Sequence, residues 1–151
     1  MSPAAVALSK PSGHTVLAFD FGEKYVGVAV GDTETGLASP LCLIAQASRE
    51  KRLAEIDALV REWRPEKLVV GLPLAMDGAE LDTARRARRF ARQLEARLRL
   101  PVELADERLS SSEAEGILRK AGRGAREHKH EVHALAAQII LQDYLDESAR
   151  R

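Results

Sequence analysis

Residues 16–22 read Val-Leu-Ala-Phe-Asp-Phe-Gly, and this stretch decides the fold. Its β-branched and aromatic residues favour a strand, in the middle of which an unpaired carboxylate would be costly to bury. We therefore expect Asp20 at the end of the strand, beside a turn that Gly22 permits. Residues 25–30 are again strand-like, which predicts a hairpin. Glycines inside it, such as Gly27, leave room for another segment to approach closely.

Asp20 allows two interpretations at this point. A carboxylate at the end of an apolar strand, followed by glycine, lies where a metal ion or a phosphate can reach it. The alternative is a turn aspartate that hydrogen-bonds only to its own backbone. The segment alone does not decide between them.

Composition limits the class of protein. A chain of 151 residues with 45% hydrophobic and 30% charged residues is typical of one globular domain. No apolar run approaches the roughly 20 residues that a membrane-spanning helix needs. We expect a single domain at residues 15–147, preceded by a disordered tail at residues 1–14. The tail has neither the basic start nor the cleavage site of a signal peptide, so we expect a cytoplasmic location.

Cysteine and charge exclude further classes. Cys42 is the only cysteine, which rules out an internal disulfide and a thiolate zinc cluster. The formal net charge of zero argues against indiscriminate nucleic-acid binding, although a neutral total can hide a basic face opposite an acidic site. Whether the chain binds nucleic acid therefore depends on how its charges are distributed over the surface.

The rest of the chain predicts an α/β fold. After the hairpin we expect elements in the order strand 38–45, helix 49–63, strand 67–71, helix 80–98, strand 102–105, helix 112–121 and helix 131–146. The order βββαβαβα implies a mixed five-stranded sheet, antiparallel on one side and parallel on the other, with helices on both faces. Residues 122–129 combine glycines with basic residues and are expected to be a mobile loop.

Acidic residues recur at a second strand end. Asp106 and Glu107 follow the strand at 102–105, and ligands of α/β sheets bind beyond the carboxyl ends of parallel strands. These acids could therefore meet Asp20. Neighbours on a strand point to opposite faces, so only one of the two should face it. The alternative is a helix cap with a salt bridge to Arg108.

Four motifs in order resemble one family. They are Phe19-Asp20-Phe21-Gly22 with Gly27-Val28-Ala29, Gly71-Leu72-Pro73-Leu74 with Met76-Asp77-Gly78, Asp106-Glu107-Arg108-Leu109-Ser110, and Ala134-Leu135-Ala136-Ala137 leading to Ile140-Leu141. Together they resemble the YqgF family, also called RuvX, of RNase H-like homologues of Holliday-junction resolvases assigned to pre-16S rRNA processing. The resemblance covers nearly the whole chain.

The resemblance implies an RNase H-like fold and a metal-dependent nuclease site. Carried over residue by residue, Asp20 and Glu107 are the metal-binding carboxylates, with Asp106 beside them as an alternative ligand. The last helix departs from the family, because His133 stands where the family has an aspartate. His133 is then expected as a ligand, which would favour Mn²⁺ over Mg²⁺. Its alternative is a partly buried histidine satisfied by a backbone group.

Basic residues gather in two segments. On a helical wheel of residues 80–98 the arginines cover most of the side opposite the apolar face, with few acids to pair them. Such a basic face can contact the phosphates of a nucleic acid. The alternative is a face that is only solvated. The expected nucleic-acid contacts are Arg85, Arg89, Arg92 and Arg108, with Arg123, Arg126 and Lys129 in the predicted loop.

The sequence thus predicts a metal-dependent nuclease for structured nucleic acid, using Mg²⁺ or Mn²⁺. Processing of the 16S rRNA precursor is the leading role, with precursor rRNA or branched DNA and ribosomal particles as partners of a monomer or homodimer. One alternative is a Holliday-junction-type DNA resolvase. Another is a non-catalytic RNA-binding or assembly protein, because the last-helix aspartate is absent. An actin-like ATPase shares the opening hairpin but needs a second lobe.

Overall fold

The computed structural model describes residues 14–73, 82–106 and 125–150, and within residues 125–131 only the backbone. The strands are β1 (Thr15–Phe21), β2 (Tyr25–Asp32), β3 (Leu37–Ala45), β4 (Lys67–Leu72) and β5 (Val102–Asp106). The helices are α2 (Arg49–Trp63), α3 (Asp82–Leu98) and α5 (Ala125–Ala149). The predicted helix at 112–121 and nearly all of the predicted tail at 1–14 lie outside these ranges.

The five strands form one mixed sheet in the order β3-β2-β1-β4-β5. β1 pairs antiparallel with β2, and β2 pairs antiparallel with β3. On its other side β1 pairs parallel with β4, which pairs parallel with β5. The predicted mixed five-stranded sheet is confirmed, and β1 lies at its centre.

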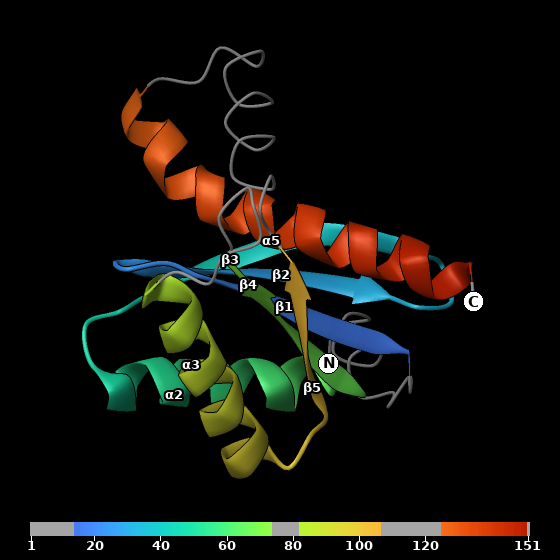
Figure 1. The fold of residues 1–151 in the computed structure, drawn as a ribbon, viewed down its shortest axis with the longest axis horizontal. Helices are drawn as coiled ribbons and strands as arrows, with labels where there is room; N and C mark the ends of the chain where they lie inside the picture. Colours follow the sequence, from blue (N-terminus) through green and yellow to red (C-terminus); the bar gives the residue numbers. More distant parts are fainter. Residues whose placement is uncertain (1–13, 74–81, 107–124, 151) are drawn as a thin grey trace, which may run out of the picture.

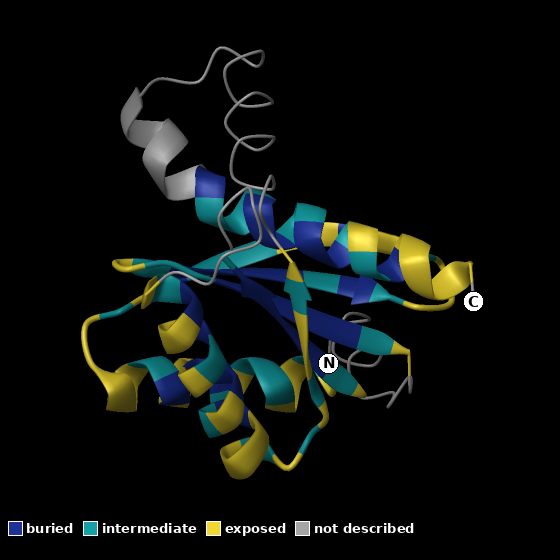
Figure 2. Ribbon diagram, in the orientation of Figure 1, coloured by how far each residue is buried: buried dark blue, intermediate teal, exposed yellow. Residues whose placement is uncertain are grey.

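Helices cover both faces of the sheet, as predicted. α2 and α3 pack against one face and α5 crosses the other (Figure 1). Each interface has its own hydrophobic core, in which Phe19 and Phe90 belong to the α2/α3 side, and Ala18 and Leu141 to the α5 side. Figure 2 shows that β1 and β4 are buried over most of their length between these layers. Because side chains alternate along β1, Asp20 shares the α5 face with Ala18.

The ends of α2 show how local chemistry sets the element boundaries. The Ser48 side chain caps the helix by accepting a hydrogen bond from the backbone N–H of Lys51 at 3.1 Å. At the other end Arg64 adopts the left-handed conformation, with φ of 47°, and its N–H donates to the carbonyl of Val60. The helix therefore stops at Trp63, which is the predicted end. In the described ranges no helix is long and apolar enough to span a bilayer.

The predicted loop at residues 122–129 is wrong from residue 125 onward, because α5 begins at Ala125. The last helix was predicted to start at residue 131, so α5 also begins earlier than predicted. After Gly124 the chain contains neither glycine nor proline through Ala149, and alanine, arginine, glutamate and lysine favour helix. The basic composition was the misleading feature, since charged residues without an apolar anchor occur on solvated helices as well as in loops.

Candidate active site

Asp20 is buried inside β1, one residue before the strand ends. It is 3% exposed, and its backbone pairs with Gly27 of β2. Its Oδ2 atom lies 2.8 Å from Nδ1 of His133 on α5. The interpretation as a turn aspartate that bonds only to its own backbone is therefore wrong, because the partner of the carboxylate is a side chain 113 residues later in the chain.

His133 is held at the boundary between sheet and solvent. Its side chain is 29% exposed, against 4% for that of Asp20. The hydrogen bond with Asp20 raises the pKa of His133, burial opposes this, and the negative charge of Asp20 adds to the rise. The interpretation as a histidine satisfied by a backbone group is also wrong, because its described partner is the Asp20 carboxylate.

Two glycines make room for His133. A Cβ atom on Gly22 would lie 2.6 Å from His133 Cε1, and one on Gly27 would lie 2.0 Å from the His133 carbonyl oxygen. Real Cβ atoms essentially never approach so closely. The close approach predicted at the hairpin glycines is confirmed, and α5 is the segment that approaches. Gly22 also makes the predicted turn, since its N–H donates to the Tyr25 carbonyl at 2.9 Å.

The second acidic motif is described only as far as Asp106, the last residue of β5. Glu103, two residues before Ala105, accepts a hydrogen bond from Tyr144 of α5, and Ala105 packs against the α5-side core. By alternation Asp106 points to the other face, away from that of Asp20. Glu107, Arg108 and Arg123, together with the side chains of Arg126 and Lys129, lie outside the described residues.

Asp20 and His133 fit part of a metal site. In the described ranges no group of three or more histidine, cysteine, aspartate or glutamate side chains could hold a metal ion. The pair does bring one carboxylate oxygen and one imidazole nitrogen together. This donor set suits a divalent transition metal better than Mg²⁺, which prefers oxygen ligands. A metal ion held by this pair would need further ligands.

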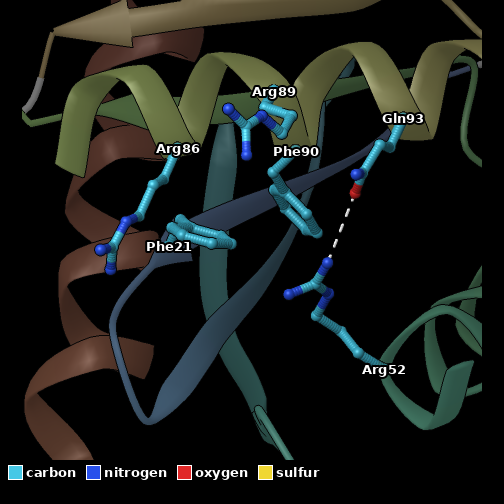
Figure 3. A pocket seen from close by; sticks show the side chains of 6 residues that line it. All are labelled: Phe21, Arg52, Arg86, Arg89, Phe90 and Gln93. Atoms are coloured by element: carbon cyan, nitrogen blue, oxygen red, sulfur yellow. Dashed lines mark hydrogen bonds between the residues drawn. The ribbon is translucent and has the colours of Figure 1, made fainter. Parts of the chain in front are cut away.

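The basic face of α3 is confirmed as exposed, with Arg85, Arg89 and Arg92 all on the surface. Arg85 lies 3.7 Å from Asp82, one turn earlier. Beside it, α2 and α3 form a pocket of about 230 Å³ that Arg86 and Arg52 also line (Figure 3). Sequence reasoning missed Arg52; the available signal was a second basic residue one turn after Arg49 on the helix that packs beside α3.

The amino-acid sequence of the chain is similar to those of known proteins. The sequence model of the RuvX family, described as Holliday junction resolvase, matches residues 14–147. The chain belongs to the RuvX family. Two RuvX relatives carry the name "Putative pre-16S rRNA nuclease". That of Methylobacillus flagellatus is 50% identical over 131 residues, covering 87% of this chain and 90% of the relative. That of Nitrosospira multiformis is 46% identical over 139 residues, covering 92% of each.

A solved structure shares the RuvX fold found here. The RuvC protein of T. thermophilus, in complex with a Holliday junction substrate, superposes with a TM-score of 0.52 at 18% identity, covering 90% of this chain and 96% of RuvC. The predicted RNase H-like fold is therefore confirmed, and the chain is a member of a nuclease family.

Proposed function

We propose that this chain is a metal-dependent nuclease that hydrolyses phosphodiester bonds in structured nucleic acid, and that its role is processing of the 16S rRNA precursor. One observation carries the proposal: in a RuvX chain, the buried Asp20 carboxylate is held by His133 at the carboxyl end of the central strand. The name shared by the bacterial relatives supports the substrate. Such a substrate would place the protein in the cytoplasm, in contact with ribosomal particles.

Asp20, Glu107 and His133 would hold the ion. When bound, a divalent ion would supply an activated water and stabilise the leaving oxygen. The fold contributes position, because Asp20 is fixed by the pairing of its backbone with Gly27 of β2 and by His133 from the α5 side of the sheet. Burial of the carboxylate also limits competition from bulk water, which strengthens its interaction with a cation.

Glu107 is preferred to Asp106 as the second carboxylate. Asp106 lies on the opposite side of β5 from Glu103 and Ala105, which share the α5 face with Asp20. A ligand of the same ion must reach that face. This parity argument agrees with the assignment that the family resemblance implies, and by the same alternation Asp106 lies on the α3 side of β5.

A second candidate function is cleavage of four-way DNA junctions. It is favoured by the description of the family as Holliday junction resolvase. A third, a non-catalytic RNA-binding or assembly role, follows from His133 replacing an acid in the site. These functions differ in what is cut, so one assay separates them.

The test is to incubate the purified protein with a 16S rRNA precursor transcript and, separately, with a four-way DNA junction, in Mg²⁺ and in Mn²⁺. The proposal predicts metal-dependent cleavage of the transcript and none by an Asp20→Asn variant. Preferential cleavage of the junction would favour the resolvase. Cleavage of neither substrate with either ion, by protein that still binds RNA, would favour the assembly role.

A further inference from the structure

The pocket beside Phe21 has a strongly basic lining. We call it the arginine pocket, lined by Phe21, Arg52, Arg86, Arg89, Phe90 and Gln93. At about 230 Å³ it has room for a phosphate with several waters, each of which occupies ~30 Å³. Three lining side chains are cationic and none is acidic. A neighbouring pocket of about 520 Å³ shares Arg89 and adds Arg49 and Arg92, so the basic lining continues between α2 and α3.

Arg52 is a half-buried cation of this pocket, and it has no carboxylate partner in the described part of the chain. Its guanidinium lies 5.7 Å from the ring of Phe21 and 5.2 Å from that of Phe90 (Figure 3). It donates to the neutral amide oxygens of Gln46 and Gln93, and its buried Nε has no partner there. Burial, and then the charge of Arg49, lower the pKa of Arg52. A bound anion would compensate this desolvated charge.

The two α3 arginines at the rim are available for such an anion. Arg86 and Arg89 are exposed and form no ion pair with any described residue. Arg97, further along the same helix, contrasts with them, because Asp57 holds its guanidinium at 2.7 Å. Guanidinium groups donate in a planar fork that matches phosphate oxygens. Phe90 is only 1% exposed, so its ring offers little surface for base stacking.

The arginine pocket lies at the same end of β1 as Asp20 but on the opposite face, since Phe21 follows Asp20 directly. Gln46 connects the arginine pocket with the turn that follows Asp20. It accepts a hydrogen bond from Arg52 and donates to the carbonyl of Gly22 at 2.5 Å, and Gly22 lies against His133. A nucleic-acid strand bound in the arginine pocket would therefore lie beside the turn at Gly22, which supports the candidate active site.

We propose that the arginine pocket binds a phosphate group of the nucleic-acid strand, with Arg52 as its fixed cation and Arg86 and Arg89 as the outer contacts. The proposal rests on the proposed function, because it takes the nuclease substrate as its ligand. The phosphate bound in the arginine pocket could be an internal phosphodiester of the nucleic-acid strand or a terminal phosphate at its end.

The test is binding of fluorescently labelled single-stranded RNA, measured by anisotropy in EDTA over a series of salt concentrations. One oligonucleotide has hydroxyl ends and the other a 5′-phosphate. One variant combines Arg52→Met with Arg86→Gln, and a second combines Arg86→Gln with Arg89→Gln, which changes only exposed residues. The matched control combines Arg61→Gln with Arg150→Gln, which removes the same charge at exposed positions outside both pockets.

Both pocket variants should bind at least about tenfold more weakly than the control, and the log–log salt slope should fall by about 0.7 for one lost phosphate. Weakening with both oligonucleotides identifies an internal phosphodiester, and weakening only with the phosphorylated one identifies a chain end. Binding equal to that of the control with both oligonucleotides would overturn the proposal. Since the assay needs neither metal nor cleavage, its result is independent of whether the Asp20 site is a nuclease.

Discussion

At the scale of single residues, the molecule depends on a carboxylate and an imidazole that share one hydrogen bond. Asp20 is the only buried charged side chain in the described ranges, and His133 is its partner there. A buried carboxylate without compensation would destabilise the fold, so the pair has a structural role as well as a proposed chemical one. Substitutions here should therefore affect both stability and activity, and the two effects can be measured separately.

Asp20→Asn should abolish cleavage while the protein still folds. The amide has the size of the carboxylate but carries no charge for an ion. It also loses a charge-assisted hydrogen bond with His133, so the free energy of unfolding should fall by about 2 kcal/mol. Nuclease assays and chemical denaturation of the same preparation measure the two effects. Full activity in a folded Asp20→Asn protein would remove Asp20 from the site.

The His133–Asp20 pair should make stability depend on pH. The folded state raises the pKa of His133 above the ordinary value of 6.5, so the fold binds the histidine proton more tightly than the unfolded chain does. The stabilisation is fully present below about pH 6.5 and is lost as the pH rises through the folded pKa. Denaturation in EDTA from about pH 5 to about pH 9 should show this loss in the parent and not in His133→Gln. Identical profiles would refute the coupling.

His133 should also set the metal preference of the nuclease. Mn²⁺ should support cleavage better than Mg²⁺, and activity should fall as the pH drops through the raised pKa of His133, because a protonated imidazole cannot bind metal. His133→Asp should restore use of Mg²⁺ and flatten the pH profile. His133→Ala should lose activity with either ion. If His133→Ala cleaves as well as the parent in Mn²⁺, the histidine takes no part in the chemistry.

At the scale of elements, the site exists because α5 lies directly on β2. Gly27 is the contact point, since no other residue leaves space for the His133 backbone. Buried alanines on α5 complete the close packing, with Ala136 and Ala137 both fully buried. The position of His133 over Asp20 is thus a property of the helix–sheet interface as much as of either residue.

Gly27→Ala should therefore displace α5 and destabilise the protein by about 3 kcal/mol or more, because the new Cβ would meet the His133 backbone, which cannot rotate away. The matched control is Gly36→Ala. Gly36 has φ of 73° but nothing within 4 Å of an added Cβ, so only backbone strain of about 1 kcal/mol is expected. Thermal denaturation measures both. Equal losses for the two variants would show that Gly27 matters only for backbone conformation.

At the scale of the whole molecule, a formal net charge of zero conceals an uneven distribution. α3 presents arginines along its exposed side, and the lining of the two pockets that α3 forms with α2 contains no acid. Asp20 and His133 lie on the other face of the sheet. Attraction of a polyanion to this molecule would therefore be local, and it should depend on particular arginines rather than on total charge.

Replacing Arg85, Arg89 and Arg92 together with glutamine should weaken nucleic-acid binding with little effect on the fold, because all three side chains are exposed. Each lost phosphate contact should reduce the log–log salt slope by about 0.7 to 0.9. Titrations of RNA at several salt concentrations provide the measurement. A slope unchanged from the parent would mean that this face is only solvated.

The sequence by itself determined the layout of the sheet, the helices at 49–63 and from about residue 80 to 98, and the unusual position of Asp20, whereas His133 was expected only from the family resemblance. The sheet, the helices and the position of Asp20 follow from local signals: β-branched runs, helical spacing of Leu53 and Ile56, and a charged residue in an apolar strand. It did not determine where α5 begins, because a basic segment without apolar anchors has no periodicity that separates helix from loop.

Only the tertiary structure decided which groups meet. The hydrogen bond between Asp20 and His133 joins residues 113 positions apart, and Arg52 reaches the arginine pocket from a different helix than Arg86 and Arg89. Such contacts depend on the packing of α5 and α2 against opposite faces of the sheet. Periodicity reports which side of an element is buried, but the partner across the interface is chosen by shape, as Gly22 and Gly27 show by admitting His133 where any larger residue would exclude it.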